Sequence, residues 1–317
     1  MQPALSVLFL TTLIGAGQGL FLALFLAELA GHVGWLAPVS RPFLALASVV
    51  ALVLMGLGLF SSFFHLGRPE RGWRAATRWR TSWLSREVIV LPLFMAALAL
   101  YALAQASGWS ASHAVPTLAL GAVTALLALA LYVCTGMIYA CLKFLQEWAS
   151  PLTVINYLLL GVASGFTVAT ALAAYAALAL MPFFGTGALL ATAAAFVGRG
   201  AALVRNARLR PRSTLATAIG IRHPRIVQIS QGMMGGSFNT REFFHGRSRA
   251  FFRSIKWVFV VLAFALPAAL LAAGLWLSAP LLPALAFVIQ YVGLLAERWF
   301  FFAQANHPQN LYYQAVA

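Results

Sequence analysis

The chain has 317 residues, of which 62% are hydrophobic and only 9% are charged. Its 21 Lys and Arg residues outnumber six acidic residues, all of them Glu, and give a formal net charge of +15. This composition excludes a water-soluble globular protein. It predicts an all-α integral membrane bundle, because backbone polar groups surrounded by lipid must bond within the structure.

Eight apolar runs are long enough to cross a bilayer, whose hydrocarbon core of about 30 Å needs roughly 20 helical residues. They lie near residues 5–30, 42–64, 88–106, 115–142, 152–180, 183–204, 257–277 and 281–303. Their length favours helices over barrel strands, and they predict a single membrane domain over residues 1–317. The first run is too long, and lacks the basic leader, for a cleavable signal peptide.

The first and fifth runs contain glycines that predict close helix packing. These are Gly15, Gly17 and Gly19 in the first run and Gly161 and Gly165 in the fifth. Glu28 and His32 lie four residues apart near the outer end of the first run, so they share one helix face. We expect them to form an interfacial pair, and a second proton path is the alternative.

The connection between the second and third runs holds the most suggestive polar cluster. Residues 64–71 read Phe-His-Leu-Gly-Arg-Pro-Glu-Arg, and residues 82–87 read Ser-Trp-Leu-Ser-Arg-Glu. His65 follows the second run, where the helix dipole favours imidazolium. Glu87 is expected in the first turn of the third run, after an N-cap at Ser85. Physical reasoning leaves two roles open: capping charges, or a proton-handling pair at the membrane edge.

Cysteine and histidine positions argue against a redox centre inside this chain. Cys134 and Cys141, both in the fourth run, are too few to hold an iron–sulfur cluster, and we interpret them as small buried residues. A bis-histidine haem needs imidazoles that face each other within the bundle, whereas all six histidines lie at helix ends, in loops or in the tail. We therefore expect no haem and no metal in this chain.

Basic residues lie almost entirely on one side of the predicted bundle: 20 of the 21, with Arg41 as the exception. Short basic loops stay in the cytoplasm, so we expect both termini and a basic loop near 205–255 to be cytoplasmic. Orientation and contact with anionic membrane lipid account for this charge, and nucleic acid is not indicated. The loop is expected to form an ordered docking surface, with the tail at 307–313 as a strap that contacts a partner.

Two further acids, Glu147 and Glu297, lie at the inner ends of predicted helices. Lys143 and Arg298 are their nearest basic neighbours in the sequence. We expect local ion pairs at both positions.

The motif around His65, its second half at 82–87 and the eight-helix layout resemble the anchor subunits of dimethyl sulfoxide reductase, the DmsC-like family. The resemblance covers most of the chain. It implies a haem-free, quinone-reactive subunit that anchors a molybdopterin catalytic subunit and an iron–sulfur subunit in the bacterial inner membrane. In that family the histidine and the glutamate of the motif are tied to quinol binding, and they correspond to His65 and Glu87.

A cytoplasmic docking face favours the sulfite-oxidising, SoeC-like branch of this family, which the segments 135–139, 237–244 and 297–304 also resemble. This branch implies sulfite oxidation coupled to quinone reduction on the cytoplasmic face. A menaquinol-oxidising anchor of a dimethyl sulfoxide reductase-type complex is the alternative within the family. The long basic loop near 205–255 is a difference from the shorter members of the family.

Quinone chemistry assigns roles to five residues of the cluster. Reduction of a quinone takes two electrons and two protons, and His65 and Glu87 are the expected proton donors. Arg68 and Arg86 are expected to stabilise oxyanion charge, and Trp83 to line the pocket for the ring of a ubiquinone or menaquinone.

Two rival classes remain. A secondary transporter would need broken helices and polar residues near the midplane, whereas most helix centres here are Ala, Leu, Val and Phe. A purely structural anchor without quinone chemistry leaves the cluster of His65 and Glu87 with no task beyond docking.

Overall fold

The computed structural model describes residues 1–230, 240 and 242–313. Eight helices in this part are long and apolar enough to cross a membrane. They are α1 (Leu5–His32), α2 (Arg41–Ser62), α3 (Trp83–Ala106), α5 (Ala114–Ala140), α6 (Pro151–Ala176), α7 (Met181–Ala207), α10 with η5 and α11 (Arg249–Val260, Val261–Ala265, Leu266–Leu277) and α12 (Leu281–Ala303). No strand occurs in the described ranges. The predicted all-α bundle of eight transmembrane helices is confirmed.

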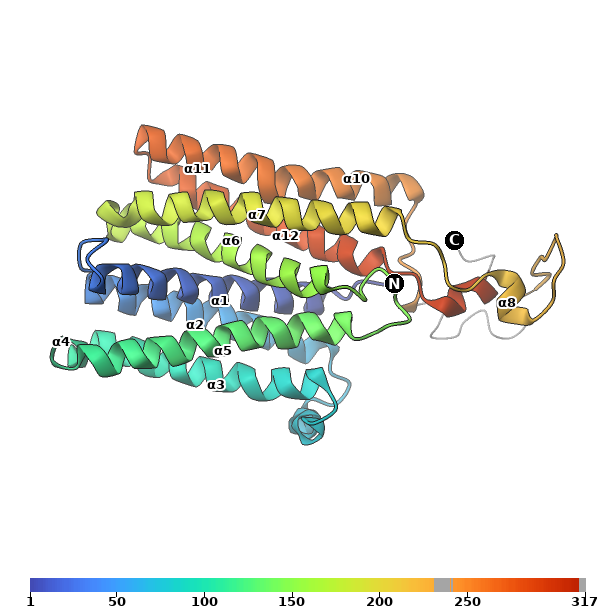
Figure 1. Ribbon diagram of the computed structural model, residues 1–317, viewed down its shortest axis with the longest axis horizontal. Coiled ribbons are helices and arrows are strands. Elements are labelled where there is room, and N and C mark those ends of the chain that lie inside the picture. The colour runs from blue at the N-terminus through green and yellow to red at the C-terminus, as the bar shows by residue number, and fades with distance from the viewer. Residues whose placement is uncertain (231–239, 241, 314–317) are drawn as a thin grey trace.

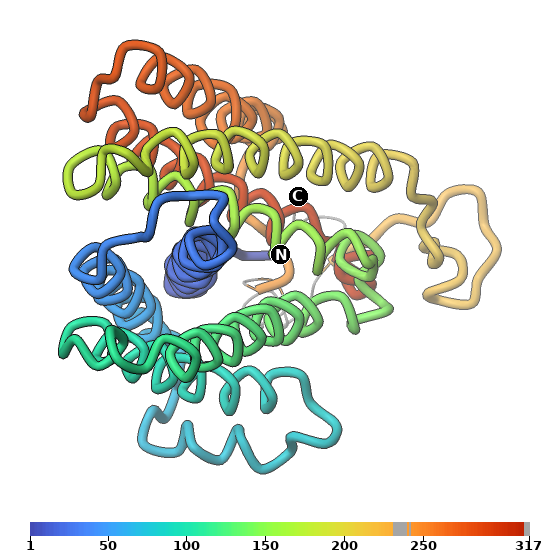
Figure 2. The backbone as a smooth tube through the Cα atoms, turned by 60° about the vertical axis from the view of Figure 1, so that its left-hand side comes forward, coloured from blue at the N-terminus to red at the C-terminus, as the bar shows by residue number. Residues whose placement is uncertain are grey.

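Two helices, α1 and α6, form the centre of this bundle. Of the most apolar stretch of each, 78% and 72% is buried inside the protein. Helix α1 packs on α2, α5, α6 and α12, and α6 packs on α5, α7 and α12. The helices before and after residue 150 therefore form two groups of four that meet along α1 and α6, and α1 runs through the middle of the molecule in Figure 2.

Glycines allow α1 and α6 to cross at backbone distance, as predicted. A Cβ atom added at Gly19 would overlap the carbonyl of Gly161, and one added at Gly165 would overlap the backbone of Gly19. Gly17 allows a close contact on the other side of α1, where an added Cβ would collide with Met55 of α2. The central crossing of α1 and α6 thus requires glycine, which has no side chain, at the points where the two backbones touch.

The two ends of the bundle differ in the structure that covers them (Figure 1) and in charge. One end carries η1 (Phe63–His65), η2 (Pro69–Arg78), α8 (Leu215–Ile219), η6 (Pro308–Tyr312) and the N-terminus. We call it the basic end, because it holds the basic connections. The other end carries α4 (Trp109–Ser112), η3 (Leu178–Leu180), the turn between α1 and α2, and Arg41.

The tail and the connection after α7 fold together at the basic end. The Tyr312 hydroxyl donates to the carbonyl of Ala218 at 2.9 Å, and the Asn310 amide donates to the carbonyl of Phe243 at 3.0 Å. This part of the predicted docking surface is therefore ordered against the tail. Residues 231–239 and 241, which include part of the predicted 237–244 motif, lie outside the described residues.

A π-helical turn, η5, interrupts the seventh span where α12 approaches it. A Cβ on Gly293 of α12 would overlap the backbone of Ala263 in η5, and the Gln290 amide donates to the Ala263 carbonyl at 3.4 Å. The wider turn thus accommodates a close helix crossing and pairs with a buried amide from the neighbouring helix.

The two cysteines differ in environment. Cys134 is buried within α5, as expected. Cys141 is exposed, so the prediction that both are buried is wrong for this residue. The reason is local: α5 ends at Ala140, and Cys141 lies in the cap beyond it.

Candidate functional site

His65 and Arg68 lie on the surface of the basic end. His65 ends the 3-10 turn that follows α2, and Arg68 precedes η2. Both side chains are exposed, and neither makes a hydrogen bond or an ion pair with any residue that the structure describes. They are free to contact a bound molecule, but the structure does not join either of them to Glu87.

The start of α3 differs from the prediction. Ser82, in extended conformation, is the N-cap, and its hydroxyl accepts a hydrogen bond from the backbone N–H of Ser85 at 3.3 Å. The prediction of an N-cap at Ser85 is therefore wrong. Because the helix already begins at Trp83, Glu87 lies beyond the first turn and deeper along α3 than expected.

Arg86 and Trp83 pair with each other. The Arg86 guanidinium lies 4.2 Å from the centroid of the Trp83 ring, a cation–π contact. It also donates to the carbonyls of Trp79 and Arg80, at 2.9 and 3.0 Å. Arg86 therefore fastens the end of the η2 connection to α3, and neither residue lines the cavity that contains Glu87.

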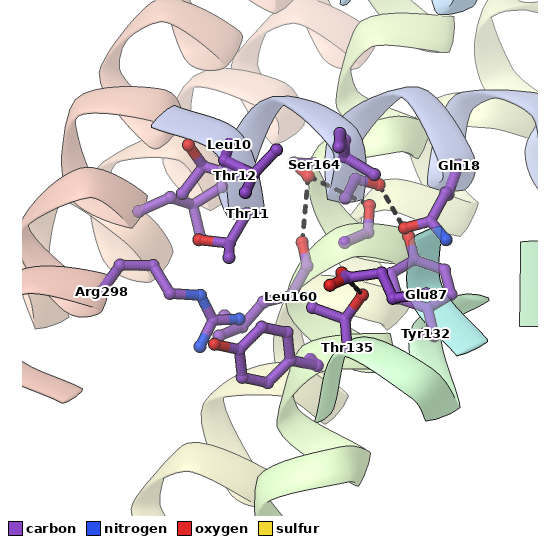
Figure 3. Close-up of a pocket in the computed structure, with 15 residues that line it drawn as sticks. Leu10, Thr11, Thr12, Gln18, Glu87, Tyr132, Thr135, Leu160, Ser164 and Arg298 are labelled. Carbon is purple, nitrogen blue, oxygen red and sulfur yellow. Dashed lines mark hydrogen bonds between the residues drawn. The ribbon is translucent and has the colours of Figure 1, made fainter. Parts of the chain in front are cut away.

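Glu87 faces a small polar cavity between α1, α3, α5, α6 and α12 (Figure 3). Its polar lining comprises Thr11, Thr12, Gln18, Glu87, Tyr132, Thr135, Tyr157, Ser164 and Arg298. The Thr135 hydroxyl donates to the half-buried carboxylate of Glu87 at 2.5 Å. The cavity volume is about 20 Å³, enough for a water molecule.

Helix α5 is held against α1 along one wall of this cavity. The Tyr132 hydroxyl donates to the carbonyl of Gly15 at 2.7 Å, and the Gln18 amide donates to the carbonyl of Ala128 at 3.1 Å. These polar contacts bridge two helices whose neighbouring side chains are apolar. They fix the distance between the helix that carries Thr135 and the core of the bundle.

Arg298 reaches toward the cavity from the side opposite Glu87 (Figure 3). Its guanidinium lies 3.7 Å from the centroid of the Tyr157 ring, and its Nη1 lies 3.4 Å from Oε2 of Glu297. Oε1 of Glu297 lies 2.7 Å from Nε of Arg199. The three charged side chains are each at least 95% buried and form one ion cluster inside the membrane domain.

The predicted pairing of the inner acids is half right. Glu297 pairs with Arg298 as expected, although its shorter contact is with Arg199. Glu147 forms no ion pair with Lys143 in the described part of the chain. Its carboxylate instead accepts hydrogen bonds from the backbone and the side chain of Asn306, at 3.4 and 3.0 Å. Asn306 of the tail thus takes the place expected for Lys143 as the partner of Glu147.

Glu28 at the opposite end is also paired differently from the prediction. Its carboxylate accepts hydrogen bonds from the Tyr101 hydroxyl at 2.7 Å and from the Gln105 amide at 2.8 Å. His32 contacts the backbone carbonyl of Glu28, at 3.1 Å, and not its carboxylate. The predicted interfacial pair is therefore wrong, because α3 supplies stronger partners than the helix face that the two residues share.

Sequence reasoning missed most of the cavity. Gln18 and Ser164 stand alone among apolar residues, and this is the signal that could have identified them. Thr135 lies in the segment 135–139, which stood out only for its family resemblance, and Arg298 was expected only as the ion-pair partner of Glu297. Arg199 gave no signal, because it precedes a run of basic loop residues.

The sequence of this bundle matches a known class of membrane anchor. The family model described as "DMSO reductase anchor subunit (DmsC)" matches residues 1–303, so the chain belongs to this family and is a multi-pass membrane anchor subunit. It is also similar to a sulfite dehydrogenase subunit from Allochromatium vinosum, with 52% identity over the full length of both chains. The resemblance inferred from the motif is confirmed.

Proposed function

We propose that this chain is the quinone-reactive anchor of a complex that oxidises sulfite and reduces membrane quinone. Its partners are an iron–sulfur subunit, which delivers electrons, and a molybdopterin catalytic subunit, both docked at the basic end. The family match and the likeness to a sulfite dehydrogenase subunit support this proposal. The observation that carries it is Glu87, a half-buried carboxylate at the edge of a polar cavity on α3.

The residues present fit a quinone at the rim of the cavity and not inside it. A volume of about 20 Å³ holds a water molecule and is far smaller than a quinone ring. Glu87 is half-buried, and the exposed side chains of His65 and Arg68 lie at the same end of the bundle. A bound quinone would supply a two-electron, two-proton acceptor. Glu87 and His65 would hold and donate the protons, and Arg68 would attract the charge on its oxygen.

Trp83 and Arg86 have a supporting role in this proposal. Their contact stacks the guanidinium on the indole and ties the η2 connection to α3 one residue before Glu87. They would therefore position the carboxylate and border the ring, while Arg86 adds positive charge near the site. No haem or metal ion in this chain is part of the proposed chemistry.

The proposal places the basic end in the cytoplasm of a bacterium, with both termini on that side of the inner membrane. Short basic connections are retained in the cytoplasm, and all basic residues except Arg41 lie at this end or on the helices that lead to it. A menaquinol-oxidising anchor of a dimethyl sulfoxide reductase-type complex would use the same site in the reverse direction. The likeness to a sulfite dehydrogenase subunit favours quinone reduction.

The test uses the assembled complex with Glu87→Gln or His65→Ala. Each variant should reduce a short-chain quinone at least tenfold more slowly, because a proton donor is removed, while sulfite-dependent reduction of a soluble artificial acceptor stays unchanged. Glu70→Gln is the matched control, because this acid is exposed and only loosely paired with Arg71, at 3.8 Å. Wild-type quinone rates in both variants would show that the proposed site is wrong.

A further inference from the structure

Three cavities follow one another from the surface of the basic end to Glu87. The outermost, of about 710 Å³, lies between the tail and the end of α7. A second, of about 10 Å³, shares Glu147 and Asn206 with it. The third is the Glu87 cavity, which shares Arg298 with the second. Three polar cavities, each bordered by a residue that also lines the next, therefore lie in series between the surface and the proposed quinone site.

The second cavity is lined by polar atoms whose hydrogen-bonding capacity is not used by the described protein residues. These atoms are Oδ1 of Asn156, Nη2 of Arg199 and Nε2 of Gln304. Asn156 and Arg199 are only 5% and 3% exposed. Buried polar atoms in proteins almost always have a partner, and a volume of about 10–15 Å³ suffices for one water molecule. A water molecule bound between these atoms would supply the missing partners.

The two inner cavities are balanced in charge. Their walls include three arginines and three glutamates: Arg199, Arg205, Arg298, Glu87, Glu147 and Glu297. The formal charges cancel when Glu87 is ionised, and one positive charge is left over when Glu87 is protonated. Arginine does not release its proton in proteins, so the guanidinium groups orient water and carboxylates and carry no proton themselves.

We propose that protons reach Glu87 from the basic end through this path, passing along water held by Asn156 and by the cluster of Arg199, Glu297 and Arg298. The inference rests on the proposed quinone function and specifies how its protons are supplied. Glu87 gives one proton to the quinone oxygen, with electrons from the iron–sulfur partner. It regains one from water in its cavity, and that water is reprotonated from the surface. Only O–H bonds break and form along the path.

Asn156→Leu tests the path in the assembled complex, because it replaces the amide beside the second cavity with an apolar side chain of similar shape that cannot bind water. We expect quinone reduction to fall about tenfold, with a larger decline at high pH and an increased solvent deuterium isotope effect. Reduction of an artificial acceptor should not change. Asn156→Ser, which keeps a hydroxyl and leaves room for water, should restore most of the rate.

Gln290→Leu is the matched control, because this amide is equally buried in α12 but pairs with Thr192 and Ala263, away from the path. It should retain the wild-type quinone rate and isotope effect. If Glu87→Gln is slow but Asn156→Leu behaves like Gln290→Leu, the path is overturned and the quinone site stands. If Asn156→Leu also slows the artificial acceptor, its effect is structural and the path is equally overturned. Wild-type rates in both Glu87→Gln and His65→Ala would instead refute the proposed function.

Discussion

Glu297 is the residue on which the buried charges of this protein depend. Ionised side chains within a membrane domain are costly unless they are paired, and Glu297 is the only described carboxylate within salt-bridge distance of Arg199 and Arg298. Removing one partner of such a cluster leaves uncompensated charge. The acid therefore matters more for stability than either arginine alone.

Glu297→Gln should destabilise the folded protein by about 3–5 kcal/mol, because it leaves two buried arginines without a counter-charge. Arg199→Met combined with Glu297→Gln should recover part of this loss, since only Arg298 then remains unpaired. Thermal unfolding of the detergent-solubilised complex measures both effects. Glu70→Gln serves as control, with a change below about 1 kcal/mol at its exposed pair. Equal melting of the Glu297 and Glu70 variants would refute the assigned role of Glu297.

The sequence could predict part of the site at this scale. His65 and Glu87 stand out because charged residues border apolar runs there in a motif that a known family shares. The depth of Glu87 could not be predicted, because three candidate capping residues, Ser82, Thr81 and Ser85, occur together and only the backbone conformation selects Ser82. At Glu297 the sequence predicted the pair with Arg298 but not the contact with Arg199, since helix packing alone brings Arg199 on α7 next to α12.

At the scale of elements, the crossing of α1 and α6 organises the bundle. Both helices are surrounded by others, and their contact is backbone against backbone at Gly19 and Gly165. Association of helices in lipid depends on van der Waals packing, so small residues at the crossing contribute directly to stability. The same crossing places Gly161 and Ser164 of α6 beside the Glu87 cavity.

Gly165→Ala should destabilise the bundle by roughly 1–3 kcal/mol, because the added methyl group overlaps the backbone of α1 and neither helix can move without losing other contacts. Gly56→Ala in α2 is the control, since its Cβ would meet no atom within 4 Å. Alanine suits a helix better than glycine, so this control should be neutral or slightly stabilising. Unfolding midpoints of the purified protein give the comparison, and equal midpoints would argue against the tight crossing.

Most helices could be predicted from apolar runs alone, but their ends follow other rules. The seventh run was expected to begin near 257, whereas α10 begins at Arg249 behind an N-cap at Ser248. Its first turns contain Arg253 and Lys256, so a hydropathy pattern excludes them although the helix continues through them. Backbone hydrogen bonds form in polar helix turns at a membrane surface as well as in apolar turns. A search for apolar runs therefore misses such turns and predicts a helix that is too short.

At the scale of the whole molecule, charge is distributed along one axis. The basic end carries η2, α8 and the tail, and the far end has Arg41. The sequence predicts this asymmetry directly, since loop order alone assigns each charge to a side. We expect the basic end to face the cytoplasm, because Lys and Arg in short connections are retained there.

Reporter fusions test this orientation. Alkaline phosphatase fused after Ser213 or Ala317 should be inactive, because the enzyme folds only after export and these positions are expected in the cytoplasm. A fusion within the turn at Gly34, at the far end, should be active and serves as control. The opposite pattern would reverse the orientation and, with it, the assignment of sulfite oxidation to the cytoplasmic face.

The central position of α1 has a consequence for how the protein is made. This helix is synthesised first, yet its glycine face is covered only when α6 follows more than a hundred residues later, a delay on the order of ten seconds during translation. Glu28 is paired earlier, when α3 brings Tyr101 and Gln105 into the membrane. Before α3 is inserted, α1 exposes the Glu28 carboxylate to lipid. Its glycine face stays exposed for longer, until α6 follows. The order of the chain therefore leaves α1 only partly packed in the membrane until α6 has been inserted.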